Sequence, residues 1–168
     1  WAKLHNLKQA ARTLNFLTEH EIESYPDLES RVAEITAASA EAAAALKAAE
    51  RRLAEMAVLI KDATTCKELR PLIQEYQRAV DKKQFRRKHE GALILYEAAA
   101  KALKEQGLQK LPDLYALKAE YKQLTEQKAQ LQRQYNDAKR QTQEYGIIKQ
   151  NVDGILRTTP EKEQKQER

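Results

Sequence analysis

Two long stretches of this 168-residue chain carry apolar or small residues at alternating steps of four and three positions. The first series is Leu28, Val32, Ile35, Ser39, Ala42, Leu46, Ala49, Leu53, Met56 and Ile60. The second is Leu114, Leu117, Tyr121, Leu124, Lys128, Leu131, Tyr135, Ala138, Thr142 and Tyr145, and Ile148, Val152 and Ile155 continue it out of phase after Gly146. A seven-residue repeat places such side chains on one stripe of an α-helix, and another helix must cover that stripe. The pattern predicts two long helices packed antiparallel, because short connections favour antiparallel neighbours.

Shorter stripes predict three more helices. The first is marked by Leu4, Leu7, Ala11, Leu14 and Thr18; the third by Leu69, Ile73, Tyr76 and Val80; the fourth by Phe85, His89, Ala92, Tyr96, Ala99 and Leu103. Residues 62–65 interrupt the second helix, and Thr65 and Glu68 have the spacing of a capping box that opens the third. Asp81 is the expected cap of the fourth helix and Gly107 its C-terminal stop.

The sequence also contains one unit twice. Tyr25-Pro26-Asp27-Leu28 and Leu111-Pro112-Asp113-Leu114 lie 86 positions apart, each after a short helix and before a long one. Proline is tolerated in the first turn of a helix, and an acidic residue there faces the positive end of the helix dipole. The expected fold is all-α, an elongated helical bundle or coiled coil built from two helix–loop–long-helix repeats. Its expected parts are a first helical hairpin (1–61), a bridging helix (62–81), a second hairpin (82–157) and a disordered tail (158–168).

Positive charge is concentrated in the middle of the chain. The net charge is +5, and residues 62–110 hold 11 Lys and Arg against 7 Asp and Glu. Much of this excess lies in one run of seven residues, whose cations are Lys82, Lys83, Arg86, Arg87 and Lys88. Side chains four apart share a helix face, so this run predicts a basic surface that would bind phosphates. The alternative is an ordinary solvated helix surface with no ligand.

Catalytic and cofactor motifs are missing from the sequence. The four glycines are isolated, so no glycine-rich loop could cradle a phosphate, and the three histidines lack metal-ligand spacing. Cys66 is the single cysteine, which leaves no internal disulfide. No apolar run approaches the roughly 18 residues of a membrane span. We therefore predict no catalytic residue, cofactor or metal, no membrane contact and a cytoplasmic location.

Several segments resemble the C-terminal helical region of relaxase, or mobilisation, nucleases from bacterial conjugative elements. They are Lys8–His20, Tyr25–Val32, Leu111–Leu114 and Tyr145–Val152, and the resemblance extends over roughly residues 4–157. In that family a separate N-terminal domain nicks DNA, using a tyrosine nucleophile and a histidine-bound metal. No position of this chain matches that motif. One further departure is Glu21, where a helix-ending glycine is expected and where the second repeat has Gly107.

The resemblance implies a non-catalytic accessory domain of a DNA-processing protein, acting in plasmid or transposon mobilisation. Its implied partners are single-stranded or origin DNA, and relaxosome or coupling proteins. A purely structural scaffold or dimerisation module without DNA contact is the alternative, and a homodimer would suit it. An enzyme is the third and least favoured reading, because no catalytic site is found. The chain begins at Trp1 without an initiator methionine, so we expect a fragment or a processed chain.

Overall fold

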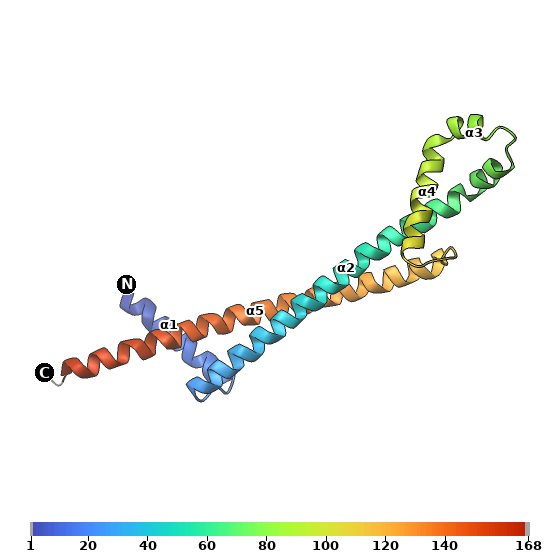
Figure 1. Ribbon diagram of the computed structural model, residues 1–168. Helices are drawn as coiled ribbons and strands as arrows, with labels where there is room; N and C mark the ends of the chain where they lie inside the picture. The colour runs from blue at the N-terminus through green and yellow to red at the C-terminus, as the bar shows by residue number, and fades with distance from the viewer. Residues whose placement is uncertain (1, 167–168) are drawn as a thin grey trace. The chain divides into compact units, whose positions relative to one another are not determined.

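The protein is all-helical, as the sequence predicts. A computed structural model describes the backbone of residues 2–166 and the side chains of residues 6–157. Over that range it contains no strand and five helices: α1 (Ala2–Glu19), α2 (Tyr25–Arg78), α3 (Lys82–Lys88), α4 (Glu90–Glu105) and α5 (Leu114–Gln166) (Figure 1). The chain forms two compact units. The first unites the chain up to Leu46 with the chain from Gln130 onward, and the second is Lys47–Ala129.

These units differ from the predicted series of hairpins. Each unit combines one stretch of α2 with one stretch of α5, so each is built from segments far apart in the sequence. The predicted boundaries near residues 61 and 82 do not coincide with either division. The reason is that a long antiparallel pair makes its contacts across the helices, whereas consecutive residues of one helix do not pack against each other.

The first unit packs α1 against α2 and α5. Its core consists of Phe16, Leu28, Tyr145 and Ile148, with partly buried apolar side chains around them. The Phe16 and Tyr145 rings meet edge to face with centroids 4.9 Å apart, a favoured aromatic geometry. Tyr25 of α2 contacts Asp153 of α5, and Glu29 contacts Lys149, so residue numbers rise in α2 as they fall in α5 and the two helices run antiparallel here.

The second unit packs α4 against α2. Its core cluster is Cys66, Ala99 and Leu103, while Met56 and Leu93 are each 1% exposed. Ion pairs join α2 to α5, Lys128 to Glu50 at 3.0 Å and Arg52 to Glu120 at 3.4 Å. Residue numbers rise in one helix as they fall in the other, so α2 and α5 are antiparallel in this unit too, as predicted.

The predicted seams of the two long helices are confirmed. Every seam position of α2 from Leu28 to Ile60 is buried or half-buried, and so is every seam position of α5 from Leu114 to Tyr145. After the phase change at Gly146, Ile148 and Val152 remain covered, whereas Ile155 is 46% exposed.

The prediction of which face of α1 is buried is wrong. Leu7 and Leu14 are 67% and 65% exposed, whereas Thr13 and Phe16 are buried. The Thr13 hydroxyl donates to the Gln9 carbonyl and accepts a hydrogen bond of 3.0 Å from the Asn151 amide. A polar residue can occupy the core here because its hydrogen bonds are complete.

The predicted break at residues 62–65 is also wrong, since α2 continues through it. The hydroxyl groups of Thr64 and Thr65 donate to the carbonyls of Ile60 and Lys61 in the preceding turn. They therefore cap no helix, and there is no separate bridging helix. Pro71 consequently lies inside α2 instead of in a first turn.

The predicted fourth helix is divided into α3 and α4 at His89, whose φ and ψ are −122° and 21°. Asp81 is the cap that the sequence predicts, because its carboxylate accepts a 2.9 Å hydrogen bond from the Gln84 amide. Arg86 and Glu97 form a 3.1 Å ion pair although they lie 11 positions apart. A straight helix would separate them by about 16 Å along its axis, so the bend at His89 makes the pair possible.

The two repeats share one helix-ending motif. Glu21 and Gly107 are the two positive-φ residues of the described chain, at 54° and 78°. In each copy the next amide bonds back five residues, Ile22 to the Leu17 carbonyl (2.9 Å) and Leu108 to the Leu103 carbonyl (3.1 Å). This is the Schellman geometry, and it explains why glycine is expected at residue 21.

The two Pro-Asp starts are used differently. In the first copy Ser24 precedes α2, and its hydroxyl is 2.6 Å from the Asp27 carboxylate and accepts from the Asp27 amide. Proline and aspartate therefore occupy the first turn, as predicted. In the second copy Asp113 itself is the cap, accepting a 2.9 Å bond from the Tyr115 amide, and Pro112 precedes the helix.

The segment expected to be a disordered tail is helical as far as it is described. α5 continues to Gln166, and residues 167–168 lie outside the described chain. Extending an existing helix costs far less than starting one, and this segment is rich in Glu, Lys and Gln, which are good helix formers.

Candidate nucleic-acid interface

The basic run predicted to bind phosphates forms α3, in the second unit. A cap at its N-terminus and ring contacts of one inward-facing side chain hold this short helix in place. Asp81 caps its N-terminus, and the Phe85 ring packs 5.9 Å from the Tyr76 ring of α2 and 4.5 Å from the His89 ring. Seven residues are too few for an independent helix, so these contacts account for its stability.

All five candidate cations on α3 are exposed. With 3.6 residues per turn, four of them fall within a sector of about 140°: Lys82, Lys83, Arg86 and Arg87. Lys88 lies outside this sector. The sector points away from the side that carries Phe85. We call the exposed side chains of Lys82, Lys83, Arg86, Arg87 and Lys88 the α3 basic surface.

Arg86 differs from the other members of this surface because it is paired. Its guanidinium lies 3.1 Å from the Glu97 carboxylate, and both side chains are about half exposed. Hydrogen bonding to Glu97 and to Tyr76 raises the pKa of Arg86 above its ordinary value. Arg86 therefore orients α3 on α4, and only part of its charge is available to a ligand.

The other four cations have no ion-pair partner among the described residues: Lys82, Lys83, Arg87 and Lys88. Asp81, the acid that directly precedes Lys82, uses a carboxylate oxygen as the helix cap, and Glu90 follows Lys88 by two positions at the start of α4. A surface of unpaired cations attracts anions, with an attraction that salt screens. The Phe85 ring is half-buried against Tyr76 and His89, so the exposed groups of this surface are cations, which suit phosphates better than bases.

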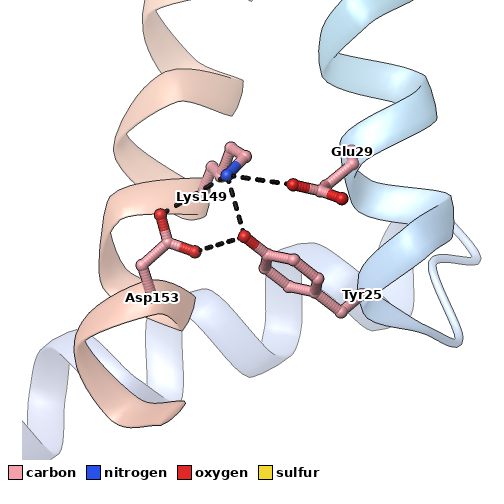
Figure 2. A network of polar contacts seen from close by, with 4 residues as sticks. All are labelled: Tyr25, Glu29, Lys149 and Asp153. Atoms are coloured by element: carbon pink, nitrogen blue, oxygen red, sulfur yellow. Dashed lines mark hydrogen bonds and ion pairs between the residues drawn. The ribbon is translucent and has the colours of Figure 1, made fainter. Parts of the chain in front are cut away.

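A second polar cluster joins α2 and α5 in the first unit (Figure 2). The Lys149 ammonium lies 2.9 Å from the Tyr25 hydroxyl, 3.4 Å from Asp153 and 3.5 Å from Glu29. The Tyr25 hydroxyl donates a 2.7 Å hydrogen bond to the other oxygen of Asp153. One cation thus satisfies two carboxylates and a phenol at once.

The proton positions of this cluster follow from its charges. The hydrogen bond to Tyr25 and the Asp153 charge raise the pKa of Lys149, whereas the hydrogen bond from Tyr25 lowers the pKa of Asp153. The Lys149 contact lowers the pKa of Tyr25, but Asp153 and partial burial outweigh it and raise the net value. Tyr25 is therefore a protonated hydrogen-bond donor, which suits structural bridging better than nucleophilic attack.

The remaining chemistry-bearing residues are used in packing. His20 donates from Nδ1–H to the Phe16 carbonyl at 2.9 Å and stacks on the Phe16 ring. Cys66 is buried in the core of the second unit, and burial, with the Asp62 charge, raises its pKa. His5 lies outside the described side chains. Within the described part, no three His, Cys, Asp or Glu side chains are grouped as a metal site would require.

Comparison with protein-family models, curated proteins and solved structures finds no match to this chain. In the part of the chain that the structure describes, no helix combines the length and apolar character of a membrane span.

The sequence identified the α3 cations but missed the Tyr25–Lys149 cluster. Each of its members is an ordinary surface residue when only its sequence neighbours are considered. Asp153 does lie four residues after Lys149, which is a spacing for ion pairs in a helix. Tyr25 lies 124 positions away from Lys149, so only the antiparallel register of α2 and α5 brings the phenol to the ammonium.

Proposed function

We propose that this chain is a non-catalytic accessory domain of a bacterial conjugative relaxase that binds DNA through the α3 basic surface. The observation that carries the proposal is the presence of four exposed, unpaired cations on one anchored helix. The resemblance of several sequence segments to the C-terminal region of relaxases supplies the biological setting, which is plasmid or transposon mobilisation in the bacterial cytoplasm. Relaxosome or coupling proteins are further proposed partners.

The mode of binding follows from the chemistry of α3. Lysine and arginine side chains neutralise phosphates and release condensed counterions, which makes the affinity independent of sequence and strongly dependent on salt. For single-stranded DNA each neutralised phosphate contributes about 0.7 to the slope of log affinity against log salt. Four free cations therefore give a slope of about −2.8.

The test compares the natural chain with a variant that carries Lys82→Glu, Lys83→Glu, Arg87→Glu and Lys88→Glu. Arg86 is retained, so its pair with Glu97 continues to hold α3. A control with the same change of net charge reverses four exposed cations of α5: Lys118, Lys122, Arg133 and Lys139. Fluorescence anisotropy with a labelled single strand, over a salt series, measures both affinity and slope.

The proposal expects the α3 variant to lose binding and the α5 variant to keep most of it, with unchanged circular dichroism in both. Equal loss in the two variants would show that only net charge matters. Binding that survives the α3 reversals would refute the interface. In that case the alternative, a structural scaffold or dimerisation module without DNA contact, would become the better description of the chain.

A further inference from the structure

A cavity in the second unit combines two cations with an aromatic wall. Its volume is about 460 Å³, and its lining residues are Cys66 and Arg70 of α2, Tyr96 of α4, and Lys110 and Leu111 of the connection that precedes α5. Arg70 and Lys110 are exposed, Tyr96 is half-buried, and Cys66 is buried. Three segments of one compact unit thus meet around this space, because the Gly107 turn brings residues 110 and 111 back to the α2–α4 pair.

The charge of this cavity is one-sided. No carboxylate lines it, and among the described residues neither Arg70 nor Lys110 takes part in an ion pair. The larger cavity of the first unit, of about 650 Å³, is different. There Arg31 and Arg140 are opposed by two glutamates of the lining, and Arg31 is already paired with one of them, Glu34. Of these two cavities, the one at Cys66 is therefore the one lined by cations without a carboxylate.

We propose that the cavity lined by Cys66, Arg70, Tyr96, Lys110 and Leu111 binds a nucleotide through its phosphate. Arg70 and Lys110 supply charge-assisted hydrogen bonds to the phosphate oxygens. Tyr96 and Leu111 give the base an aromatic and apolar surface. The site is separate from the α3 basic surface and does not depend on it.

The size of the cavity favours a nucleotide over a bare phosphate ion. Small-molecule sites commonly have volumes of about 300–1,000 Å³ and are lined by apolar and aromatic groups with a few polar anchors. A tyrosine ring accepts a base by stacking, an interaction that every base can make. The nucleotide has two possible sources, a free mononucleotide or one residue of a single strand.

Amide NMR of the isotope-labelled full chain tests the proposal and separates these sources. The probes are thymidine monophosphate, thymidine without phosphate, inorganic phosphate and an oligothymidine. We expect the monophosphate to cause saturable shifts of the amides of Arg70, Tyr96 and Lys110, and thymidine to cause none. If the oligothymidine alone shifts these amides, the site belongs to a strand interface.

Two variants complete the test. Arg70→Gln and Lys110→Gln should each weaken binding about tenfold, since a hydrogen bond to a charged group is commonly worth that factor or more. Lys118→Gln with Lys122→Gln, a loss of two exposed charges on α5, should leave the affinity unchanged. The α3 reversals should also leave monophosphate binding intact, which distinguishes this site from the proposed DNA interface.

Several results would overturn the proposal. They are no saturable shift with any probe, shifts confined to α3, or equal affinity of the Arg70→Gln and Lys110→Gln variants. Inorganic phosphate binding as tightly as the monophosphate would overturn the role of Tyr96 and Leu111.

A neutral alkylating reagent gives an independent measurement, because Cys66 is the only cysteine and lines the cavity. Bound monophosphate should slow its alkylation.

Discussion

Replacing Glu21 by glycine should stabilise the protein, although the substitution removes a whole side chain. Glu21 adopts φ 54°, in the left-handed region, where its counterpart in the second repeat is Gly107. An L-residue in this region costs roughly 1–2 kcal/mol, because Cβ approaches a carbonyl oxygen. Glycine avoids that cost but loses about 0.5–1 kcal/mol more conformational entropy on folding.

The net gain for Glu21→Gly is therefore about 0.5–1 kcal/mol. The Glu21 side chain is exposed, and no hydrogen bond or ion pair of it is among those recorded for the described residues, so little is lost with it. In a protein of 150–250 residues, 1 kcal/mol corresponds to about 2–4 °C in Tm. Thermal unfolding followed by circular dichroism at 222 nm, repeated in urea, measures the change.

Gly107→Ala is the reciprocal change and should destabilise by about 1 kcal/mol. A Cβ added at Gly107 meets no atom within 4 Å, so its cost comes from the backbone and not from a clash. Together the two substitutions test whether the repeats share one helix-ending conformation.

Two controls separate the backbone from other effects. Glu21→Ala removes the carboxylate from the C-terminus of α1 but retains Cβ. Because the helix dipole disfavours a negative charge there, this removal alone should stabilise by a few tenths of a kcal/mol. Glu19→Gly places glycine two positions earlier, at the last residue of α1, and should destabilise by up to about 1 kcal/mol. The reasoning is refuted if Glu21→Ala stabilises as much as Glu21→Gly, or if Glu21→Gly destabilises.

Two further predictions concern the first unit. Thr13→Val should lower the free energy of unfolding by about 1–2 kcal/mol in urea melts, because the Asn151 amide loses its buried acceptor; an unchanged urea midpoint would show that this hydrogen bond contributes nothing net. The pKa of Asp153 is lowered by its hydrogen bond from Tyr25, so its contribution to stability is present above the ordinary pKa of aspartate and is lost as the pH falls through the folded-state pKa. Asp153→Asn should therefore reduce the loss of stability on acidification, and an identical pH profile would contradict this.

The sequence by itself determined the long helices and their seams. A seven-residue repeat maintained from Leu28 to Ile60 forms an apolar stripe along the helix, and this stripe is buried by packing against another helix. Local rules also predicted two of the helix ends, because a cap such as Asp81 and a left-handed stop such as Gly107 act on amides within a few residues. The correspondence of Glu21 with Gly107 could be predicted for the same reason.

Tertiary structure decided which of two possible faces of α1 is buried. The stripe with Leu7 and Leu14 is the more apolar one, yet the face with Thr13 and Phe16 lies in the core. That choice depends on Tyr145 and Asn151, which lie more than 120 positions away and supply an aromatic partner and a hydrogen-bond donor. Periodicity measures only how apolar a face is, and it contains no information about a complementary surface elsewhere in the chain.

The same physical distinction applies to the break at residue 62, the Tyr25–Lys149 cluster and the cavity beside Cys66. The spacing of Thr65 and Glu68 favours a helix start, but the hydroxyls of Thr64 and Thr65 bond to the preceding turn, and Cys66 is buried among side chains of α4. The burial of α2 against α4 is worth more than a local cap, so the helix continues. Where a residue's environment comes from the same few turns, the sequence determines the outcome, and where it comes from another helix, only the folded packing does.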